Sequence, residues 1–255
     1  DKDSDSETVA LTDIDSEDVS AITVEPRKGS SFTVKIKSDD SGTEYRIKGD
    51  KSGAYDQNSL STLLSTATAV SGTLVDPVCT ELERYGLDEE SQRDTVTLTQ
   101  EDDTEIKLVF GMTSDTLGGT YCMVDGSTDV YFVSSDTVDT LLQSQKKYLS
   151  LSVLGSYYAL TSSLEKMTIT PTSGTAMTIA RRDTDDMDSD VSSAYSTFRL
   201  TAPESANADD DAVNNKILSQ LQSGLTAQAI AKQHASDADL AKYGLDNPRA
   251  RIALT

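Results

Sequence analysis

The stretch Leu-Glu-Arg-Tyr-Gly-Leu-Asp at residues 82–88 returns near the end of the chain as Leu-Ala-Lys-Tyr-Gly-Leu-Asp at residues 240–246. Glycine readily takes the left-handed backbone conformation that closes the last turn of a helix. In a Schellman motif, a leucine directly after such a glycine folds back onto the residue five positions earlier. The pattern therefore predicts two copies of one helix stop, with positive φ at both glycines and a contact between the two leucines of each copy.

Each copy is predicted to be a short helix with a defined start. Asp76-Pro77 is typical of an N-cap followed by proline at the first helical position, and Ser236 or Asp237 takes the starting role in the second copy. The tyrosines are expected to pack in the core at the cap, with a binding role as the alternative. The residues assigned to this structural helix-cap motif are Leu82, Tyr85, Gly86, Leu87, Leu240, Tyr243, Gly244 and Leu245.

Composition and charge exclude several classes of function. The chain has 255 residues, which predicts one to two domains. Lys and Arg number 22 against 43 Asp and Glu, giving a net charge of −21. Such a charge repels phosphate backbones and anionic lipid surfaces, so no nucleic acid is expected as a partner. Aromatic residues are scarce and tryptophan is absent, which argues against glycan binding.

Alternating apolar residues predict an α+β fold made of antiparallel meanders with packed helices. Phe32, Val34 and Ile36 share one strand face, and a helix is predicted from the apolar residues Leu60, Leu63, Leu64 and Ala67, with Asn58 or Asp56 as its cap. Further strands are predicted around residues 95–99, 105–110, 121–124 and 130–133, with a long loop at 111–119. A second helix is predicted to start at Ser135-Asp136 and to carry Val138, Leu141, Leu142, Tyr148 and Leu149.

The same order restarts in the last part of the chain, which predicts an internal duplication. Met-Thr-Ile-Thr-Pro at residues 167–171 repeats the alternation of Ile-Thr-Val-Glu-Pro at residues 22–26. The predicted helices of this part carry Val213, Ile217 and Leu221 or lie around 227–235. The expected organisation is a flexible acidic tether at 1–8, a first repeat unit at 9–150, and a second, truncated unit at 157–255.

Both ends of the chain leave questions open at this level. Because the tether begins without methionine, we expect that an N-terminal segment has been removed from the protein. The second unit lacks counterparts of residues 105–149. Either the native chain continues past Thr255 or the sheet of the second unit is completed by the first.

Several segments resemble those of a known family, the domain of unknown function 4340. They are residues 11–24, Tyr-Gly-Leu-Asp at 85–88 and 243–246, and the runs 109–111, 119–121 and 130–133. The resemblance covers the chain from about residue 9 onwards. It implies a bacterial, exported, membrane-anchored protein, often associated with ABC-type transport or gliding-motility-like components. It assigns no catalytic residue, so none is carried over to this chain.

The candidate chemical groups give no catalytic, cofactor or metal site. The acidic run at 183–190 has Val191 and Thr197 where a calcium loop needs Gly and Glu. His234 is the single histidine, and no Gly-x-Ser-x-Gly elbow accompanies it. Cys79 and Cys122 are expected to be buried free thiols rather than a disulfide.

We therefore predict a non-enzymatic, extracytoplasmic module that binds proteins of the cell envelope or of a transporter. It would be attached to the membrane only through the removed N-terminal anchor, and it would need no cofactor. The alternative is a protein that binds a small ligand or cation in a cleft between the two units, since ligand sites favour domain interfaces. The sequence fixes neither the partner nor the oligomeric state.

Overall fold

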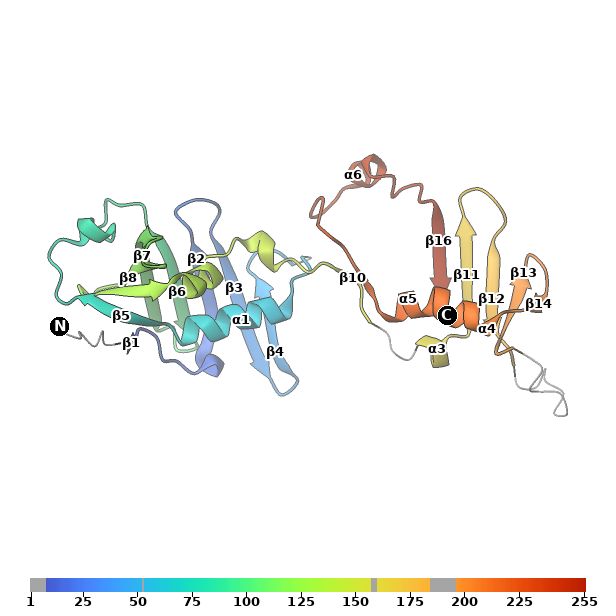
Figure 1. Cartoon of the computed structure of the whole chain (residues 1–255), viewed down its shortest axis with the longest axis horizontal. Coiled ribbons are helices and arrows are strands. Elements are labelled where there is room, and N and C mark those ends of the chain that lie inside the picture. Colours follow the sequence, from blue (N-terminus) through green and yellow to red (C-terminus); the bar gives the residue numbers. More distant parts are fainter. Residues whose placement is uncertain (1–7, 52, 157–159, 184–195) are drawn as a thin grey trace. The chain divides into compact units, whose positions relative to one another are not determined.

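The computed structural model describes residues 8–51, 53–156, 160–183 and 196–255. The chain divides into two compact units, Asp1–Ser150 and Leu151–Thr255, which we call unit 1 and unit 2. Strands predominate in both units, and every described strand pair is antiparallel. The protein is thus a sheet-rich α+β protein (Figure 1).

Unit 1 is built on one nine-stranded sheet with the order β1-β5-β9-β8-β7-β6-β2-β3-β4. Apolar residues alternate along β3 and β6, which turn one face toward the core, whereas β7 and β8 bury side chains on both faces. The strands are β1 (Thr8–Ala10), β2 (Val19–Glu25), β3 (Phe32–Asp39), β4 (Gly42–Ile47), β5 (Ser71–Asp76), β6 (Asp94–Gln100), β7 (Glu105–Ser114), β8 (Gly119–Val124) and β9 (Val130–Ser134).

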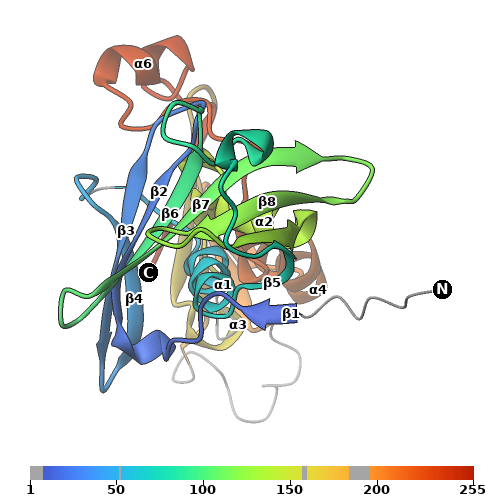
Figure 2. The same cartoon turned by 90° about the vertical axis from the view of Figure 1, so that its left-hand side faces the viewer.

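Helix α1 (Gln57–Thr68) crosses the sheet of unit 1 and buries the predicted apolar stripe of Leu60, Leu63, Leu64 and Ala67 (Figure 2). Its N-cap is Asp56, whose carboxylate accepts a hydrogen bond from the backbone N–H of Ser59 at 2.7 Å. Between the two candidate caps, the structure thus selects Asp56. The remaining helical segments of unit 1 are η1 (Ser16–Asp18), η2 (Leu82–Tyr85), α2 (Ser135–Leu141) and η3 (Gln145–Tyr148).

Unit 2 contains a five-stranded sheet, in the order β14-β13-β12-β11-β16, and a separate β10–β15 pair. Strand β16 is an edge strand, hydrogen-bonded in the sheet to β11 alone among the described strands. The strands are β10 (Ser152–Leu154), β11 (Lys166–Pro171), β12 (Met177–Arg181), β13 (Phe198–Ala202), β14 (Ala206–Asn207), β15 (Leu225–Thr226) and β16 (Ala250–Leu254).

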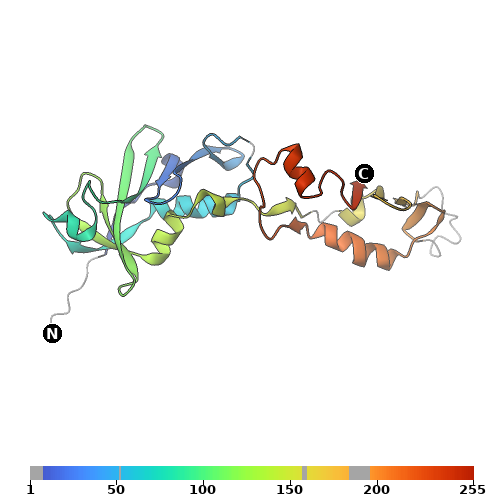
Figure 3. The same ribbon diagram turned by 90° about the horizontal axis from the view of Figure 1, so that it is seen from above.

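The helix predicted from Val213, Ile217 and Leu221 forms as three consecutive segments that lie along one face of this sheet (Figure 3). They are α4 (Asp210–Ala212), a π-helical stretch η6 (Val213–Leu218) and α5 (Ser219–Gln222). The wider π turn accommodates one more residue than an α turn does. The other helices of unit 2 are α3 (Leu160–Ser163) and α6 (Asp237–Lys242).

The central strands of the two units pair in corresponding registers. In unit 1, Val24 of β2 lies opposite Val96 of β6 and Phe32 of β3. In unit 2, Ile169 of β11 lies opposite Ile252 of β16 and Met177 of β12. Between β2 and β3 the hydroxyls of Thr23 and Thr33 lie 3.1 Å apart, and between β11 and β12 those of Thr168 and Thr178 lie 3.3 Å apart.

Four local predictions were wrong. The segment after α1 forms strand β5, which ends at Asp76, so Asp76 caps no helix. The β-branched residues of this segment and its pairing with β1 and β9 favour the extended state. Residues 111–119 are not a long loop, because the β7–β8 ladder continues to Ser114 and Gly119.

The helical prediction for residues 227–235 was also wrong, since this segment has no regular secondary structure. It is largely exposed, and a short helix without a buried face is marginal in water. The helix predicted from Ser135 ends at Leu141 and is capped by Ser134. Tyr148 belongs to a separate turn, Gln145–Tyr148.

The N-terminal tether lies outside the described residues up to residue 7, whereas Thr8 is the first residue of β1. The acidic run 183–190 also lies outside them from residue 184 onwards. In the described ranges, no helix has the length and apolar character needed to cross a membrane.

Candidate functional site

The first cap motif closes a 3₁₀ turn, Leu82–Tyr85, which is shorter than the helix predicted to start at Asp76-Pro77. Gly86 has a φ of 66°, in the left-handed region. The N–H of Leu87 donates to the carbonyl of Leu82 at 3.1 Å, and the N–H of Gly86 donates to that of Glu83 at 3.0 Å. These are the two hydrogen bonds of a Schellman motif, so the prediction for the backbone is confirmed.

The side chains of this first copy are packed against the sheet of unit 1. Leu87 is fully buried in an apolar cluster, which Leu82 and Tyr85 also contact, with Cys79, Val109, Met123 and Val130. The ring of Tyr85 lies 4.9 Å from that of Tyr121, and its hydroxyl donates to the Asp76 carboxylate at 3.1 Å. Tyr85 therefore packs at the cap, as expected from the sequence.

Gly111 of β7 lets the cap approach the strand closely, and sequence reasoning missed this role. A Cβ at Gly111 would collide with the backbone carbonyl of Tyr85. The signal was present, since a glycine inside the strand run Val-Phe-Gly indicates a close backbone approach.

The second cap motif has the same backbone but different surroundings. Gly244 has a φ of 70°, and the N–H of Leu245 donates to the carbonyl of Leu240 at 2.9 Å. Ser236 caps helix α6 in a capping box with Asp239, which selects Ser236 over Asp237 as the starting residue. However, Tyr243 is 45% exposed and Leu245 is 60% exposed. The core packing expected for Tyr243 is therefore absent here.

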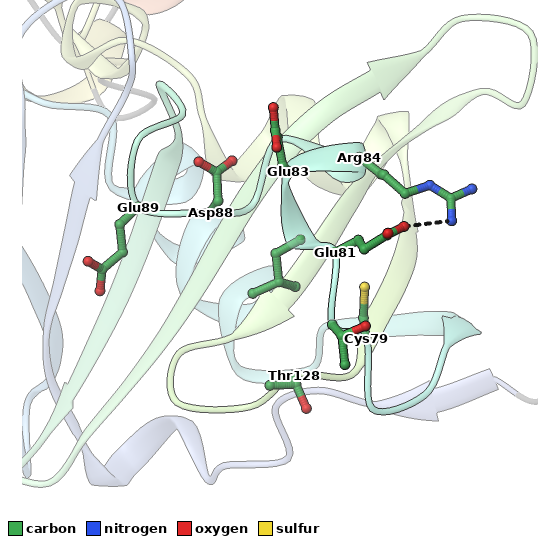
Figure 4. A pocket seen from close by; sticks show the side chains of 9 residues that line it. Cys79, Glu81, Glu83, Arg84, Asp88, Glu89 and Thr128 are labelled. Atoms are coloured by element: carbon green, nitrogen blue, oxygen red, sulfur yellow. Dashed lines mark hydrogen bonds and ion pairs between the residues drawn. The ribbon is translucent and has the colours of Figure 1, made fainter.

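An open hollow of about 840 Å³ lies beside the first cap (Figure 4). Asp88 and Glu89 lie on the opposite side from Cys79, and the Arg84 guanidinium pairs with the Glu81 carboxylate at 3.5 Å. All of its lining comes from unit 1, so this hollow is not a cleft between units. The lining residues are Cys79, Thr80, Glu81, Leu82, Glu83, Arg84, Asp88, Glu89 and Thr128.

The pKa shifts at this hollow keep the Cys79 thiol protonated and the Asp88 carboxylate ionised at neutral pH. Burial raises the pKa of the Cys79 thiol, and the nearby Asp76 carboxylate adds to the effect, so the thiol is protonated at neutral pH. A hydrogen bond from Ser91 holds the pKa of Asp88 below its usual value, and this carboxylate serves as the cap of a local turn. The carboxylates give the hollow a negative charge without an activated nucleophile.

The other candidate groups lie apart from one another. His234 is exposed and has a φ of 50°. Cys79 and Cys122 are free, buried thiols in different apolar clusters, as expected from the sequence. Within the part of the chain that the structure describes, no group of three or more His, Cys, Asp or Glu residues could hold a metal ion.

Comparison with known proteins identifies the family without adding a function. The family described as "Domain of unknown function (DUF4340)" matches residues 46–248. No curated protein and no solved structure matches the chain. The matched range covers most of the chain and includes both cap motifs. The chain therefore belongs to the domain of unknown function 4340 family.

Proposed function

We propose that this protein is a non-enzymatic binding module made of two copies of one structural unit, and that unit 2 presents the surface that binds a protein partner. The single observation that carries the proposal is the concentration of exposed large apolar side chains in unit 2. Val96 and Leu98 of β6 are fully buried, whereas Ile252 and Leu254 of β16 are 53% and 41% exposed.

The pairing registers support treating these residues as equivalent. Val96 and Leu98 lie opposite Val24 and Ile22 of β2, and Ile252 and Leu254 lie opposite Ile169 and Met167 of β11. The turn that follows β2 or β11 supports the same alignment. Gly29 and Gly174 have φ values of 115° and 112°, and a Cβ on either would lie 3.7 Å from Pro26 or Pro171.

The start of the main helix supports the duplication as well. Asp56 and Asp209 each cap a helix by accepting a hydrogen bond from the N–H three residues later. One residue after each cap, a side chain ties the helix to the neighbouring strand. Gln57 accepts from the N–H of Tyr45 at 2.9 Å, and Asp210 accepts from the N–H of Phe198 at 3.0 Å.

Unit 2 also carries most of the large apolar side chains that are exposed among the described residues, although it is the shorter unit. Leu154 and Leu225 lie opposite each other in the β10–β15 pair, and Ile252 and Leu254 share one face of β16. Where exposed apolar residues adjoin in this way, they mark protein-binding sites in soluble proteins. The exposed large apolar side chains of unit 2 are Leu151, Val153, Leu154, Leu225, Ile230, Tyr243, Leu245, Ile252 and Leu254.

In-cell photocrosslinking tests this proposal. A photoreactive amino acid is placed at Leu245 of unit 2 or, as the matched control, at the exposed Ser61 of helix α1 in unit 1. We expect a discrete adduct with another protein from position 245 and none from position 61. Equal adduct formation at both positions, or none at either, would contradict the proposal.

We further propose that the module works outside the cytoplasm, attached to the membrane by an N-terminal anchor. The acidic, serine-rich start of the chain is suited to a tether, and the family resemblance implies an exported, envelope-associated protein. Fusion of reporters that are active on one side of the membrane only tests this. Activity of the cytoplasmic reporter alone would exclude the proposed location.

A further inference from the structure

We propose that the outer face of β3 and β4 in unit 1 binds an acidic segment of a partner protein in extended conformation. This inference goes beyond the proposed function, because it assigns a second binding surface that consists of unit 1 residues only. The outer face is the side of the two strands that points away from the core. Its cations are Lys35, Lys37, Arg46 and Lys48.

The alternation of side chains brings these cations together on one side of the sheet. The side chains of the two strands that pack in or against the core are Phe32, Val34, Ile36, Tyr45 and Ile47. The residues between them share the opposite side, which faces solvent. Lys35 lies directly opposite Arg46 in the β3–β4 ladder, and the N–H of Lys48 donates to the carbonyl of Thr33 at 2.8 Å.

This face is basic although the chain is strongly acidic. Residues 27–51 contain seven of the chain's 22 Lys and Arg residues but only four of its 43 Asp and Glu residues. Like charges placed directly opposite each other destabilise an antiparallel strand pair. The pairing of Lys35 with Arg46 therefore lowers the stability of the sheet.

The positive charge of this face is only partly neutralised within the protein. The Arg46 guanidinium pairs with the Glu44 carboxylate at 2.8 Å, and Nζ of Lys37 lies 3.8 Å from an exposed carboxylate. In the part of the chain that the structure describes, Lys35 and Lys48 form no ion pair. These two lysines are thus available to a carboxylate from outside.

The fold itself does not require the two lysines. In unit 2, Ala180 lies opposite the arginine of β13 and so occupies the position of Lys35. The residue two positions after that arginine is Thr201, in the position of Lys48. Because the same ladder forms there with alanine and threonine, binding rather than folding accounts for the two lysines of unit 1.

The shape of the face favours an extended chain over a small enclosed ligand. The hollow between Lys35, Lys37 and Arg46 has a volume of only about 160 Å³, which is below the usual size of a ligand pocket. Lys35 and Lys37 are two residues apart, so their side chains repeat about every 7 Å along the strand. An extended segment with Asp or Glu at alternate positions has the same repeat and matches the charge of the face.

The charge of the rest of the chain favours a short acidic segment over larger polyanions. The chain has a net charge of −21. Salt at physiological concentration screens charges beyond about 8 Å, so a short segment interacts mainly with the basic face. A membrane surface or a nucleic acid duplex would also meet the acidic remainder of the protein and be repelled by it.

Titration of residues 1–255 with a fluorescent peptide of alternating Glu and Ser tests the inference. Fluorescence anisotropy should show binding at about 0.15 M salt and its loss at about 1 M, where the screening length falls to about 3 Å. Chemical shift changes in NMR spectra should centre on Lys35, Arg46 and Lys48. A peptide of alternating Gln and Ser is the control. No binding of the acidic peptide, or equal binding of the control peptide, would overturn the inference.

The double variant Lys35→Ala, Lys48→Thr introduces the residues that unit 2 has at these positions. We expect it to stay folded in thermal unfolding and to weaken peptide binding about fivefold or more. The double variant Lys166→Ala, Lys216→Thr makes the same change of charge at exposed lysines of unit 2 and should alter binding less than twofold. Unchanged binding in the folded unit 1 variant, or an equal loss in the unit 2 variant, would overturn the inference.

A final comparison distinguishes the acidic segment from other anionic partners. Vesicles containing phosphatidylserine and a DNA duplex are titrated under the same conditions. We expect neither to bind as tightly as the acidic peptide. Tighter binding of either one that is lost in the Lys35→Ala, Lys48→Thr variant would show that the face recognises a membrane or a nucleic acid, which contradicts the inference.

Discussion

The two cap motifs have the same backbone and opposite surroundings. Gly86 and Gly244 have φ values of 66° and 70°, and the leucine after each glycine bonds to the carbonyl five residues back. Leu87 is nonetheless fully buried, whereas Leu245 is 60% exposed. The sequence of the motif determines the turn, and the strands on which the motif packs determine whether its side chains are buried. Unit 1 provides β7, β8 and β9 for this, and unit 2 has no described strand in their place.

The largest expected difference between the two cap motifs is the stability lost when the leucine after the glycine is truncated to alanine. Leu87→Ala leaves a cavity in the cluster of Cys79, Val109, Met123 and Val130, which we expect to destabilise unit 1 by about 2–5 kcal/mol. Leu245→Ala should change the stability of unit 2 by less than about 0.5 kcal/mol, because its side chain already contacts water. Urea unfolding followed by hydrogen exchange measures the free energy of unfolding of each unit separately. Equal effects would mean that Leu245 is covered in the protein.

Replacing the glycines should have a smaller effect that is similar in both copies. Alanine in the left-handed region costs about 1–2 kcal/mol. Gly86→Ala also brings a Cβ to 2.9 Å from Cγ of Met112, whereas Gly244→Ala meets open space. Because the Met112 side chain can move, we expect Gly86→Ala to be slightly the more destabilising in thermal unfolding. A neutral effect of Gly244→Ala would contradict the assignment of a left-handed cap there.

The smallest expected effect is a loss of stability of unit 2 at acidic pH. Burial opposes ionisation of Asp210, but N–H groups of Thr197 and Phe198 bond to its carboxylate and bring its pKa below 3.8. The group therefore contributes stability above pH 3.8, and this contribution is lost as the pH falls through the lowered folded-state pKa. Gln57 makes the corresponding contact in unit 1 and does not titrate.

Acid should thus weaken the tie between helix and strand in unit 2 and leave that of unit 1 unchanged. The variant Asp210→Asn should reduce the pH dependence of unit 2 below pH 4, and Gln57→Asp should introduce one into unit 1. Hydrogen exchange of the amides of Phe198 and Tyr45 as a function of pH measures both. An unaltered acid response of unit 2 in Asp210→Asn would contradict this role of the carboxylate.

Periodic and capping signals were sufficient where local chemistry decides the structure. Helix α1 was predicted from the spacing of its leucines, and both glycine caps were predicted from the residues beside them. The prediction of a helix from Asp76-Pro77 was wrong because the pairing of β5 with β1 and β9 outweighs a local start signal. Sheet pairing joins residues far apart in the chain, and local sequence does not encode it.

At the candidate site too, local chemistry could be predicted and contacts between distant segments could not. The residues of the two cap motifs could be read from the sequence, but their difference in exposure could not. It depends on Gly111 and Val109 of β7, which pack against the first cap. The hollow beside Cys79 was also missed, since its acidic lining residues look like an ordinary solvated surface. Packing between distant segments is what the sequence left undetermined.

Residue-resolved hydrogen exchange of residues 1–255 tests most directly the proposal that β16 is the counterpart of β6 and pairs with β11 alone among the described strands. We expect Val96 and Leu98 to be strongly protected, because their N–H groups point to β7, and Ile252 and Leu254 to exchange rapidly. Thr97 and Ala253, which bond inward to β2 and β11, should both be protected. Protection of Ile252 and Leu254 equal to that of Val96 and Leu98 would contradict the proposal.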